Sequence, residues 1–300
     1  MKISFFGNPE KDEIARFLPQ WVSYLEANSH QVTMTQDLAD IYSQNFKNIK
    51  LVDEIFELCE DCDLLVSLGG DGTILWAAQL VMGKDIPLLG VKFGGLGFLA
   101  EISPEEFQVA IDEISVGKWK LQKRLMLEGR IENGQGRQIG ENTSVLNEFS
   151  VVGGNIGQVS RVDVWVDDNH VSTYIADGIL ISTPTGSTAY SLAARGPLLM
   201  PTADSMIIAP ICPHTLTARP LVVDGSAQIK ICPADDEKRP LFINADGREI
   251  SQLAGDQQLH IQKSANYITL LHRADRTFFD ILRAKLNWGD DIRQSENGKR

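Results

Sequence analysis

The chain has 300 residues, of which 43% are hydrophobic and 23% charged, and its formal net charge is −12. These proportions are typical of a globular protein with room for two domains, and they exclude a disordered or fibrous chain. Because so acidic a chain repels phosphate backbones and anionic lipids, we expect neither nucleic acid nor a membrane as its partner. The sequence opens like a strand and turn rather than a signal peptide and has no apolar run of membrane-spanning length, which predicts a cytoplasmic protein.

Strand-like and helix-like segments alternate in the first third of the sequence. Short apolar runs predict strands at residues 3–6, 31–35, 64–68 and 86–91. Helical spacing of apolar residues predicts a helix over 11–27, and Pro19 is expected to kink it or end it early. The alternation predicts an α/β domain whose open, mainly parallel sheet is covered by helices on both faces.

Two further helices are expected in this part of the chain. Residues 49–59 show helical spacing, which predicts that the apolar side chains of this segment point inward at Leu51, Val52, Ile55 and Leu58. The next helix opens at Ser103, which can cap it, with Pro104 in the first turn and Glu106 completing a capping box.

After about residue 120 the apolar period changes from that of a helix to that of a strand. Residues 162–166 and 171–175 alternate and are joined by Asp167-Asp168-Asn169, which predicts a hairpin. Similar short runs predict a largely β domain of layered sheets or a sandwich, and helical spacing returns from Arg273. We therefore expect an α/β domain at 1–122, a β-rich domain at 123–272, and a C-terminal helical segment at 273–300 that packs on the first domain.

The four cysteines are too few and too scattered for a disulfide framework. Cys59 and Cys62 form a lone C-x-x-C, for which a second pair of metal ligands would have to come from far away in the sequence. We expect reduced cysteines and no structural zinc.

A glycine-rich turn at Gly69–Thr73 follows a buried strand and precedes a helix expected to begin near Thr73. Ligands of open α/β sheets bind beyond the carboxyl ends of the strands, and glycines and helix amides at that point favour a phosphate. Asp71 is costly beside phosphates unless it holds a metal or accepts a proton from a nucleophile. The turn by itself leaves open a second interpretation, in which Asp71 only caps the helix.

The residues that follow the next strand, Gly94–Phe98, form a second glycine cluster. It is neither a P-loop nor a G-x-G-x-x-G fingerprint. Because neighbouring strands of a parallel sheet end at the same edge, we expect the two glycine turns to line one crevice.

Two stretches of the second half carry polar groups where apolar segments end. Asp177–Ser191 begins as a strand and turns through small hydroxyl residues that can bind ribose or phosphate, while Tyr190 can stack on a base. The alternative is a capped turn with Tyr190 in the core. Asn147-Glu148 places an acid within a strand-like segment, and the alternative there is a surface pair on an edge strand.

Together these residues resemble the NAD kinase family. The GGDGT turn at Gly69–Thr73 is shared with diacylglycerol, sphingosine and 6-phosphofructo-kinases, so it indicates a kinase. The Asn147-Glu148 pair, the block Asp177–Pro197, and Pro213–Leu216 with the nearby Arg219-Pro220 resemble NAD kinases in particular.

The resemblance implies transfer of a phosphoryl group from ATP, or from polyphosphate, to the 2′-hydroxyl of the adenosine ribose of NAD, with Mg²⁺ or another divalent cation. Asp71 would accept the hydroxyl proton, and Asn147, Glu148 and Tyr190 would hold the adenosine. Asp177 would lie at the nicotinamide half of the substrate or of a neighbouring subunit's site. The resemblance implies further substrate contacts at Gly72, Thr188, Ala189, Ser191, Phe98, Cys212, Asp246 and Arg248. It implies donor-phosphate contacts at Gly69, Gly70, Gly72 and Thr73, and leaves the metal ligands unassigned.

Arg248 stands where many relatives carry glutamine, so the contact at that position stays open. The family also implies a homodimer or homotetramer. Two competing functions remain: a lipid kinase of the same superfamily, which would need an apolar or basic membrane-facing surface, and an NAD(P)-sensing protein without turnover. Turnover of NAD separates both from an NAD kinase.

Overall fold

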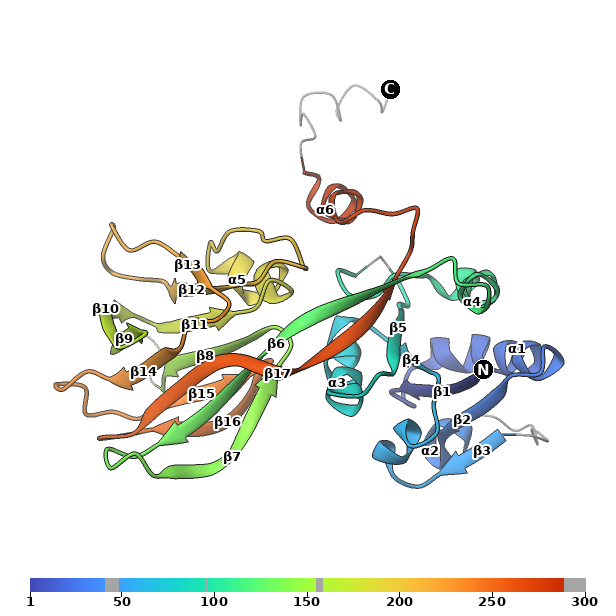
Figure 1. Cartoon of the computed structure of the whole chain (residues 1–300), viewed down its shortest axis with the longest axis horizontal. Helices are drawn as coiled ribbons and strands as arrows, with labels where there is room; N and C mark the ends of the chain where they lie inside the picture. Colours follow the sequence, from blue (N-terminus) through green and yellow to red (C-terminus); the bar gives the residue numbers. More distant parts are fainter. Residues whose placement is uncertain (41–48, 95–96, 155–158, 289–300) are drawn as a thin grey trace. The chain divides into compact units, whose positions relative to one another are not determined.

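The computed structural model describes residues 1–40, 49–94, 97–154 and 159–288. The chain divides into two compact units, Met1–Lys123 with Ile268–Arg300 and Arg124–Tyr267, here called the first and second unit (Figure 1). Within the described ranges no helix is long and apolar enough to cross a membrane. The end of the predicted C-terminal segment, from residue 289, lies outside them.

The first unit is built on a parallel sheet, which confirms the predicted α/β fold. Its strands run in the order β5-β4-β1-β2-β3, and the end of β17 (Gln258–His272) pairs in parallel with β5. Their bounds are Lys2–Gly7 for β1, Gln31–Thr35 for β2, Ile49–Val52 for β3, Leu64–Leu68 for β4 and Pro87–Val91 for β5. The helices of this unit are α1 (Asp12–Ala27), α2 (Gln36–Asp40), α3 (Asp71–Val81), α4 (Phe107–Ser115) and α6 (Phe278–Leu286).

Helix α1 runs unbroken through Pro19, so the predicted early end is wrong. Its buried residues lie on both sides of the proline at Ile14, Leu18, Trp21, Val22 and Leu25. Proline within a helix costs about 3 kcal/mol, whereas burying one large apolar side chain contributes about 1.5–3 kcal/mol. Packing of both halves on the sheet therefore outweighs the lost hydrogen bond.

The predicted helix over 49–59 is also wrong, because its first half is strand β3 and its second half a 3₁₀ helix at Ile55–Cys59. Strand β3 pairs in parallel with β2, and Glu54 forms a capping box with Glu57 that starts the new element. Leu51 and Ile55 are consequently 46% and 41% exposed instead of facing inward. The predicted capping box of Ser103 is confirmed, although it opens a 3₁₀ turn at Pro104–Glu106 before α4.

The second unit consists of two layers of mostly antiparallel strands, as predicted for the β-rich half. One sheet has the order β13-β12-β11-β8-β15-β16. Its strands are Glu148–Gly153 (β8), Gly178–Ser182 (β11), Ser205–Ile211 (β12), Leu221–Asp224 (β13), Leu241–Ala245 (β15) and Arg248–Leu253 (β16). The other layer contains Lys120–Glu132 (β6), Gln138–Val145 (β7), Ser160–Val166 (β9), Asn169–Ala176 (β10), Ile229–Pro233 (β14) and most of β17.

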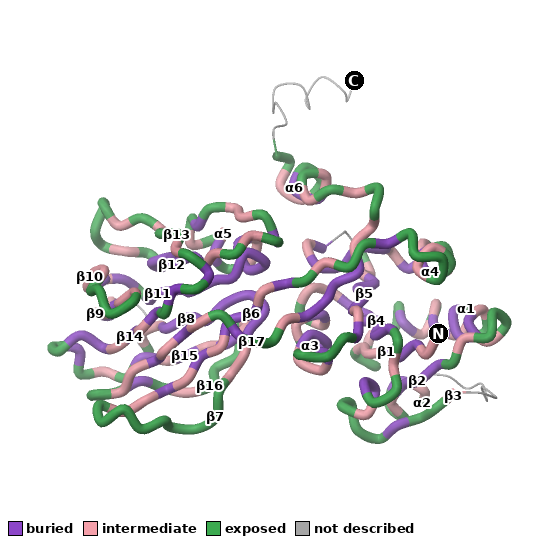
Figure 2. Tube along the Cα trace, in the orientation of Figure 1, coloured by how far each residue is buried: buried purple, intermediate pink, exposed green. Residues whose placement is uncertain are grey.

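Apolar side chains of the two layers share one core, for example Ile181 of β11 and Val164 of β9. Buried residues follow the central strands of each unit (Figure 2). The predicted hairpin is confirmed by the antiparallel pairing of β9 with β10. Asp167 and Asp168 have φ values of 47° and 63°, the left-handed conformation that twists a short turn in the same sense as its strands.

Candidate active site

Asp71 is the first residue of α3, directly after the glycines that follow β4. Gly70 occupies the N-cap position and no side-chain hydrogen bond caps the helix, so the interpretation of Asp71 as a mere cap is wrong. A Cβ at Gly69 would lie 2.1 Å from Thr73 Oγ1, whereas one at Gly70 or Gly72 would meet nothing within 4 Å. The first glycine therefore allows the turn to close, and the other two leave the backbone open to a ligand.

The Asp71 carboxylate is held by backbone groups of the second glycine turn. Phe98 N–H donates to Oδ2 and Leu99 N–H to Oδ1, both at 3.4 Å. A Cβ at Gly97 would lie 2.1 Å from Oδ1, so only glycine lets this loop approach so closely. The side chain of Asp71 is still 38% exposed. The two glycine turns thus meet at Asp71, although Gly95 and Leu96 lie outside the described residues.

One cation that sequence reasoning missed, Lys92, lies beside this carboxylate, and a second, Lys285, interacts with it electrostatically. Lys92 Nζ is 3.9 Å from Asp71 Oδ2. Burial, and then the charge of Lys92, lowers the pKa of Lys285 in α6, while Asp71 acts in the opposite direction. Lys92 directly follows β5 and precedes the second glycine cluster, a position that signals it in the sequence; nothing signals Lys285. The site therefore combines one carboxylate with two amines.

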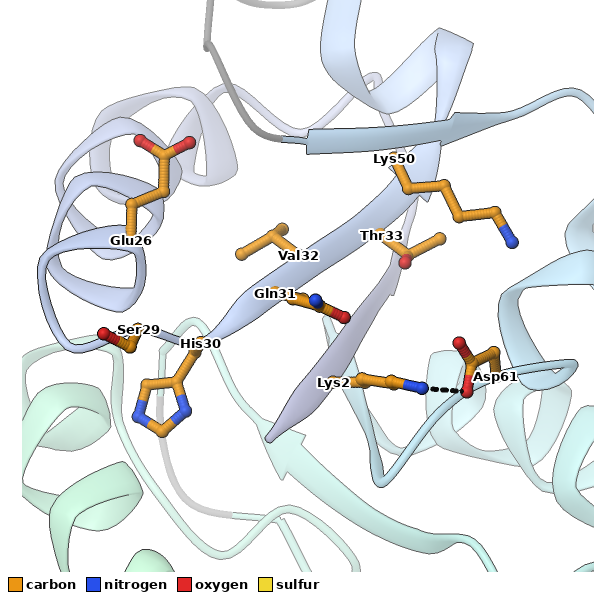
Figure 3. A pocket seen from close by; sticks show the side chains of 9 residues that line it. All are labelled: Lys2, Glu26, Ser29, His30, Gln31, Val32, Thr33, Lys50 and Asp61. Atoms are coloured by element: carbon orange, nitrogen blue, oxygen red, sulfur yellow. Dashed lines mark hydrogen bonds and ion pairs between the residues drawn. The ribbon is translucent and has the colours of Figure 1, made fainter.

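A hollow of about 540 Å³ adjoins the glycine turn and is lined by Phe6, Gly7, Asn8, Gly72, Thr73 and Trp76. It lies where β1 and β4 end, and Trp76 is 49% exposed. Another hollow, of about 450 Å³, lies at the amino ends of the parallel strands, where Lys2 contacts Asp61 (Figure 3). No residue singled out in the sequence lines that second hollow, so the candidate site is at the carboxyl ends.

In the second unit, Asp246 holds the Asn147-Glu148 pair in place. Its carboxylate accepts backbone hydrogen bonds from Leu146, Asn147 and Glu148 at 2.9, 2.8 and 3.1 Å. Asp246 N–H in turn donates to the Glu148 carbonyl at 3.0 Å. This carboxylate is therefore occupied by the chain's own backbone. That positioning role joins residues about a hundred positions apart, which the sequence did not indicate.

The hydroxyl-rich block after β11 is also built against this pair. Thr183 Oγ1 donates to the Leu146 carbonyl at 2.6 Å and accepts from Gly186 N–H at 3.0 Å. A Cβ at Gly186 would lie 2.3 Å from the Asn147 carbonyl oxygen. Thr188 Oγ1 donates to the Thr185 carbonyl at 3.1 Å. Most of these hydroxyls shape the loop, as the alternative of a capped turn predicted.

Tyr190 of α5 (Tyr190–Ala193) is 43% exposed and is not part of a core. Burial raises the pKa of its hydroxyl, and the neighbouring groups Cys212, Asp177 and Glu148 raise it further. These four predicted residues therefore share one neighbourhood. Asp177 and Cys212 are exposed at adjacent strand ends, where Asp177 N–H donates to the Ile211 carbonyl at 3.0 Å.

The other predicted contacts differ in how far they can reach a ligand. Ser191 is fully buried, and its Oγ has no hydrogen-bond partner within the described ranges. Phe98 and Ala189 are half-buried, and Arg248 is exposed.

Glu148 is a buried acid, not the surface group of an edge strand. It is 7% exposed and begins β8, a central strand between β11 and β15. Burial raises the pKa of Glu148 to about 8, the charge of Asp246 adds to this, and a hydrogen bond from Tyr190 N–H opposes it. At neutral pH the carboxyl group is therefore mostly protonated and can donate a hydrogen bond.

This burial predicts a pH dependence of stability. Between the ordinary pKa of 4.5 and about 8, folded Glu148 keeps a proton that the unfolded chain has released. The free energy of unfolding therefore falls as the pH rises through this range. Glu148→Gln removes the titration. Between about pH 5 and about pH 9 we therefore expect the variant to gain stability relative to the wild type, on the order of 4 kcal/mol.

Urea unfolding at both pH values measures this gain. The exposed Glu141→Gln serves as the control. If the free energies of unfolding of Glu148→Gln and the wild type differ by the same amount at both pH values, Glu148 is already ionised at the lower pH.

The four cysteines are free. In the described part of the chain, no group of three or more His, Cys, Asp or Glu side chains is arranged to hold a metal ion. Mg²⁺ usually takes one or two carboxylates together with substrate phosphates and water. Asp71 beside an open glycine turn fits a Mg²⁺ that enters with phosphates.

Two family models and several curated relatives that match this chain are those of NAD kinases. The family model of the ATP-NAD kinase N-terminal domain matches residues 3–119, and that of the C-terminal domain matches residues 146–273. The NAD kinase of Tolumonas auensis is 38% identical over 291 residues, which cover 97% of both chains. That of Colwellia psychrerythraea is 34% identical over 290 residues, again 97% of both.

Two solved structures share the fold. A yeast NADH kinase complexed with NADH superposes with a TM-score of 0.88 at 23% identity, covering 97% of this chain and 89% of that one. An NAD kinase from Archaeoglobus fulgidus in complex with ATP gives a TM-score of 0.71 at 24% identity, covering 96% and 99%.

Proposed function

The chain belongs to the NAD kinase family and phosphorylates NAD, and on this premise we propose that Asp71 accepts the proton of the 2′-hydroxyl on the adenosine ribose of NAD. The observation that carries the proposal is the carboxylate at the open glycine turn, oriented by two backbone N–H groups and still 38% exposed. A carboxylate so held can take up a proton without first having to reorient.

In the proposed reaction the 2′-oxygen attacks the γ-phosphorus of ATP and its proton passes to Asp71. The bond between that phosphorus and the β,γ-bridging oxygen breaks, and ADP leaves. Lys92 and Lys285 offset the negative charge of the phosphates, and the backbone at Gly69, Gly70, Gly72 and Thr73 lies against them. Phosphoryl transfer asks a protein mainly for such alignment and charge neutralisation.

The donor is ATP, with polyphosphate as the alternative. The donor phosphates beside Asp71 would hold Mg²⁺ or another divalent cation, which would lower their charge. The hollow beside Gly72 and Trp76 supports a donor site there, because it opens at the turn that presents Asp71. We assign residues 1–122 and 273–300 to donor binding and residues 123–272 to NAD binding, a division that the two compact units support.

NAD is held mainly by residues of the second unit, with Phe98 contributed by the first. Asn147 and Glu148 bind the adenosine, with protonated Glu148 as a hydrogen-bond donor, and Tyr190 stacks on the base through its exposed ring. Asp177 lies at the nicotinamide half, of this subunit or of a neighbour in a homodimer or homotetramer. Thr188, Ala189, Ser191, Phe98, Cys212 and Arg248 complete the contacts, and Asp246 acts through Asn147 and Glu148. We expect the enzyme to work in the cytoplasm.

The direct test mixes the purified chain with NAD, ATP and Mg²⁺ and detects NADP with an NADP-specific dehydrogenase. Formation of NADP that requires all three components supports the proposal. Parallel reactions with polyphosphate and with NADH define the donor and acceptor ranges. Binding of NAD in calorimetry without any turnover would instead favour an NAD(P)-sensing protein.

Replacing Tyr190 with alanine is expected to weaken NAD binding about tenfold while changing the KM for ATP less than twofold, because base stacking on an aromatic ring is worth about 1–3 kcal/mol. Calorimetry with NAD and initial rates with varied ATP measure the two effects. Tyr190→Phe keeps the ring and should bind NAD nearly as well as the wild type. Equal losses for NAD and ATP would show that Tyr190 supports the fold rather than the substrate.

A further inference from the structure

The loop that holds Asp71 is itself fastened to β5. Glu101 N–H donates to the Gly90 carbonyl at 3.2 Å, and Lys92 N–H donates to the Ile102 carbonyl at 2.9 Å. A Cβ at Gly90 would lie 2.9 Å from the Ala100 Cα, so the loop passes directly over the strand. The position of residues 97–102 therefore decides where Phe98 and Leu99 present their N–H groups to Asp71.

Two residues from the end of the chain bind this loop at Glu101. His272 Nδ1 lies 2.5 Å from Glu101 Oε1, and the two side chains are only 12% and 5% exposed. Arg276 Nη1 donates to the Glu101 carbonyl at 2.9 Å. A carboxyl group so buried is costly unless it is paired. His272 ends β17 and Arg276 precedes α6, so both lie about 170 residues from the loop in sequence.

We propose that His272 and Arg276 are positioning residues for the phosphoryl transfer: through Glu101 they hold the 97–102 loop in the conformation whose N–H groups orient Asp71. The proposal rests on the function assigned to Asp71 above. The end of the chain thereby contributes to the reaction. Without the contacts of His272 and Arg276 with Glu101, the 97–102 loop is released and the Asp71 carboxylate rotates. Neither residue touches Asp71 directly.

The test compares His272→Ala with His272→Asn. The Asn amide nitrogen can occupy the place of Nδ1 and donate to Glu101, whereas alanine removes the partner. We expect kcat of the alanine variant to fall about 10–100-fold with the KM for NAD changed less than twofold, since misplacement by about 1 Å costs that much in rate. The asparagine variant should recover most of the loss. Arg276→Ala should show a smaller loss of the same kind.

His260→Ala is the matched control, because His260 is also a partly buried imidazole beside a carboxylate, Glu132, at 3.4 Å, but it lies in the second unit. It should leave kcat unchanged even if its unfolding temperature falls as far as that of His272→Ala. Amide hydrogen exchange over residues 97–102 should speed up in His272→Ala and not in the control.

Three results would overturn the inference: an unchanged kcat for His272→Ala, an equal loss in the control, or no recovery with asparagine. Asp71→Asn is measured alongside, so that failure of the positioning inference can be told apart from failure of the role proposed for Asp71. If that variant keeps full activity, the assignment of Asp71 is wrong. If it is inactive while His272→Ala is fully active, only the positioning inference falls.

Discussion

Replacing Asp71 with asparagine is expected to lower kcat by about 10²–10⁴-fold, the usual contribution of a positioned base. Asparagine cannot take up the hydroxyl proton. It has the same size but keeps an acceptor oxygen for only one of the two N–H groups, those of Phe98 and Leu99; the bond that is lost is long, at 3.4 Å, and the side chain is 38% exposed. The KM for NAD and the unfolding temperature should therefore change little. Coupled NADP formation measures the rate, and calorimetry measures NAD binding.

The matched control is Asp37→Asn, an acid in the first turn of α2 that is exposed and distant in sequence from both glycine turns. It should retain wild-type kcat. Residual activity of Asp71→Asn within threefold of the wild type would mean that alignment and charge neutralisation alone carry the reaction, with no general base at this position.

Replacing Asp246 with alanine is expected to destabilise the protein by roughly 2–4 kcal/mol and to weaken NAD binding. The substitution leaves three backbone N–H groups of residues 146–148 without their acceptor. It also puts alanine at a φ of 46°, a conformation that aspartate and asparagine tolerate better. The pair Asn147-Glu148 should then lose its fixed orientation. Urea unfolding and NAD calorimetry measure the two effects.

Asp246→Asn keeps one acceptor oxygen and the favourable backbone, so it should fall between wild type and alanine. Asp256→Ala is the control, because Asp256 accepts an exposed hydrogen bond from Gly134 N–H at 3.1 Å, and its loss should cost under about 1 kcal/mol. Unchanged NAD binding in Asp246→Ala, despite lower stability, would separate the fold of this turn from recognition of the substrate.

The turn at Gly69–Thr73 could be predicted from its own residues and those next to it in the sequence. Its glycines, its place after a buried strand and its single acid predicted an open turn that carries a functional carboxylate, and the structure has that turn. The companion prediction is that the two glycine turns line one crevice. The described part of the second turn meets the first at Asp71, because parallel strands end at one edge of a sheet, whereas the hollow beside Gly72 is lined by residues of the first turn and of β1 and α3. The capping box at Ser103 and the hairpin turn at Asp167-Asp168 were equally predictable, since each depends on a few neighbouring residues.

Local helix propensity gave wrong predictions at two places where tertiary packing outweighs it. Pro19 does not end α1, because apolar side chains on both sides of it are buried. Residues 49–52 form a strand instead of a helix, because β2 offers a free edge to pair with and Glu54 starts a new element directly afterwards. The spacing of apolar residues along the sequence reveals neither the burial of both halves of α1 nor the free edge of β2.

What the sequence by itself determined about this protein is its local chemistry: the class of fold, the turns, and the types of side chain at the two halves of the site. Only the tertiary structure decided which groups hold those side chains. Asp246 reaches the backbone of 146–148, Lys92 and Lys285 approach Asp71, and His272 grips Glu101. The physical reason is that such contacts join segments up to about two hundred residues apart, through hydrogen bonds and charges that leave no periodic trace in the chain.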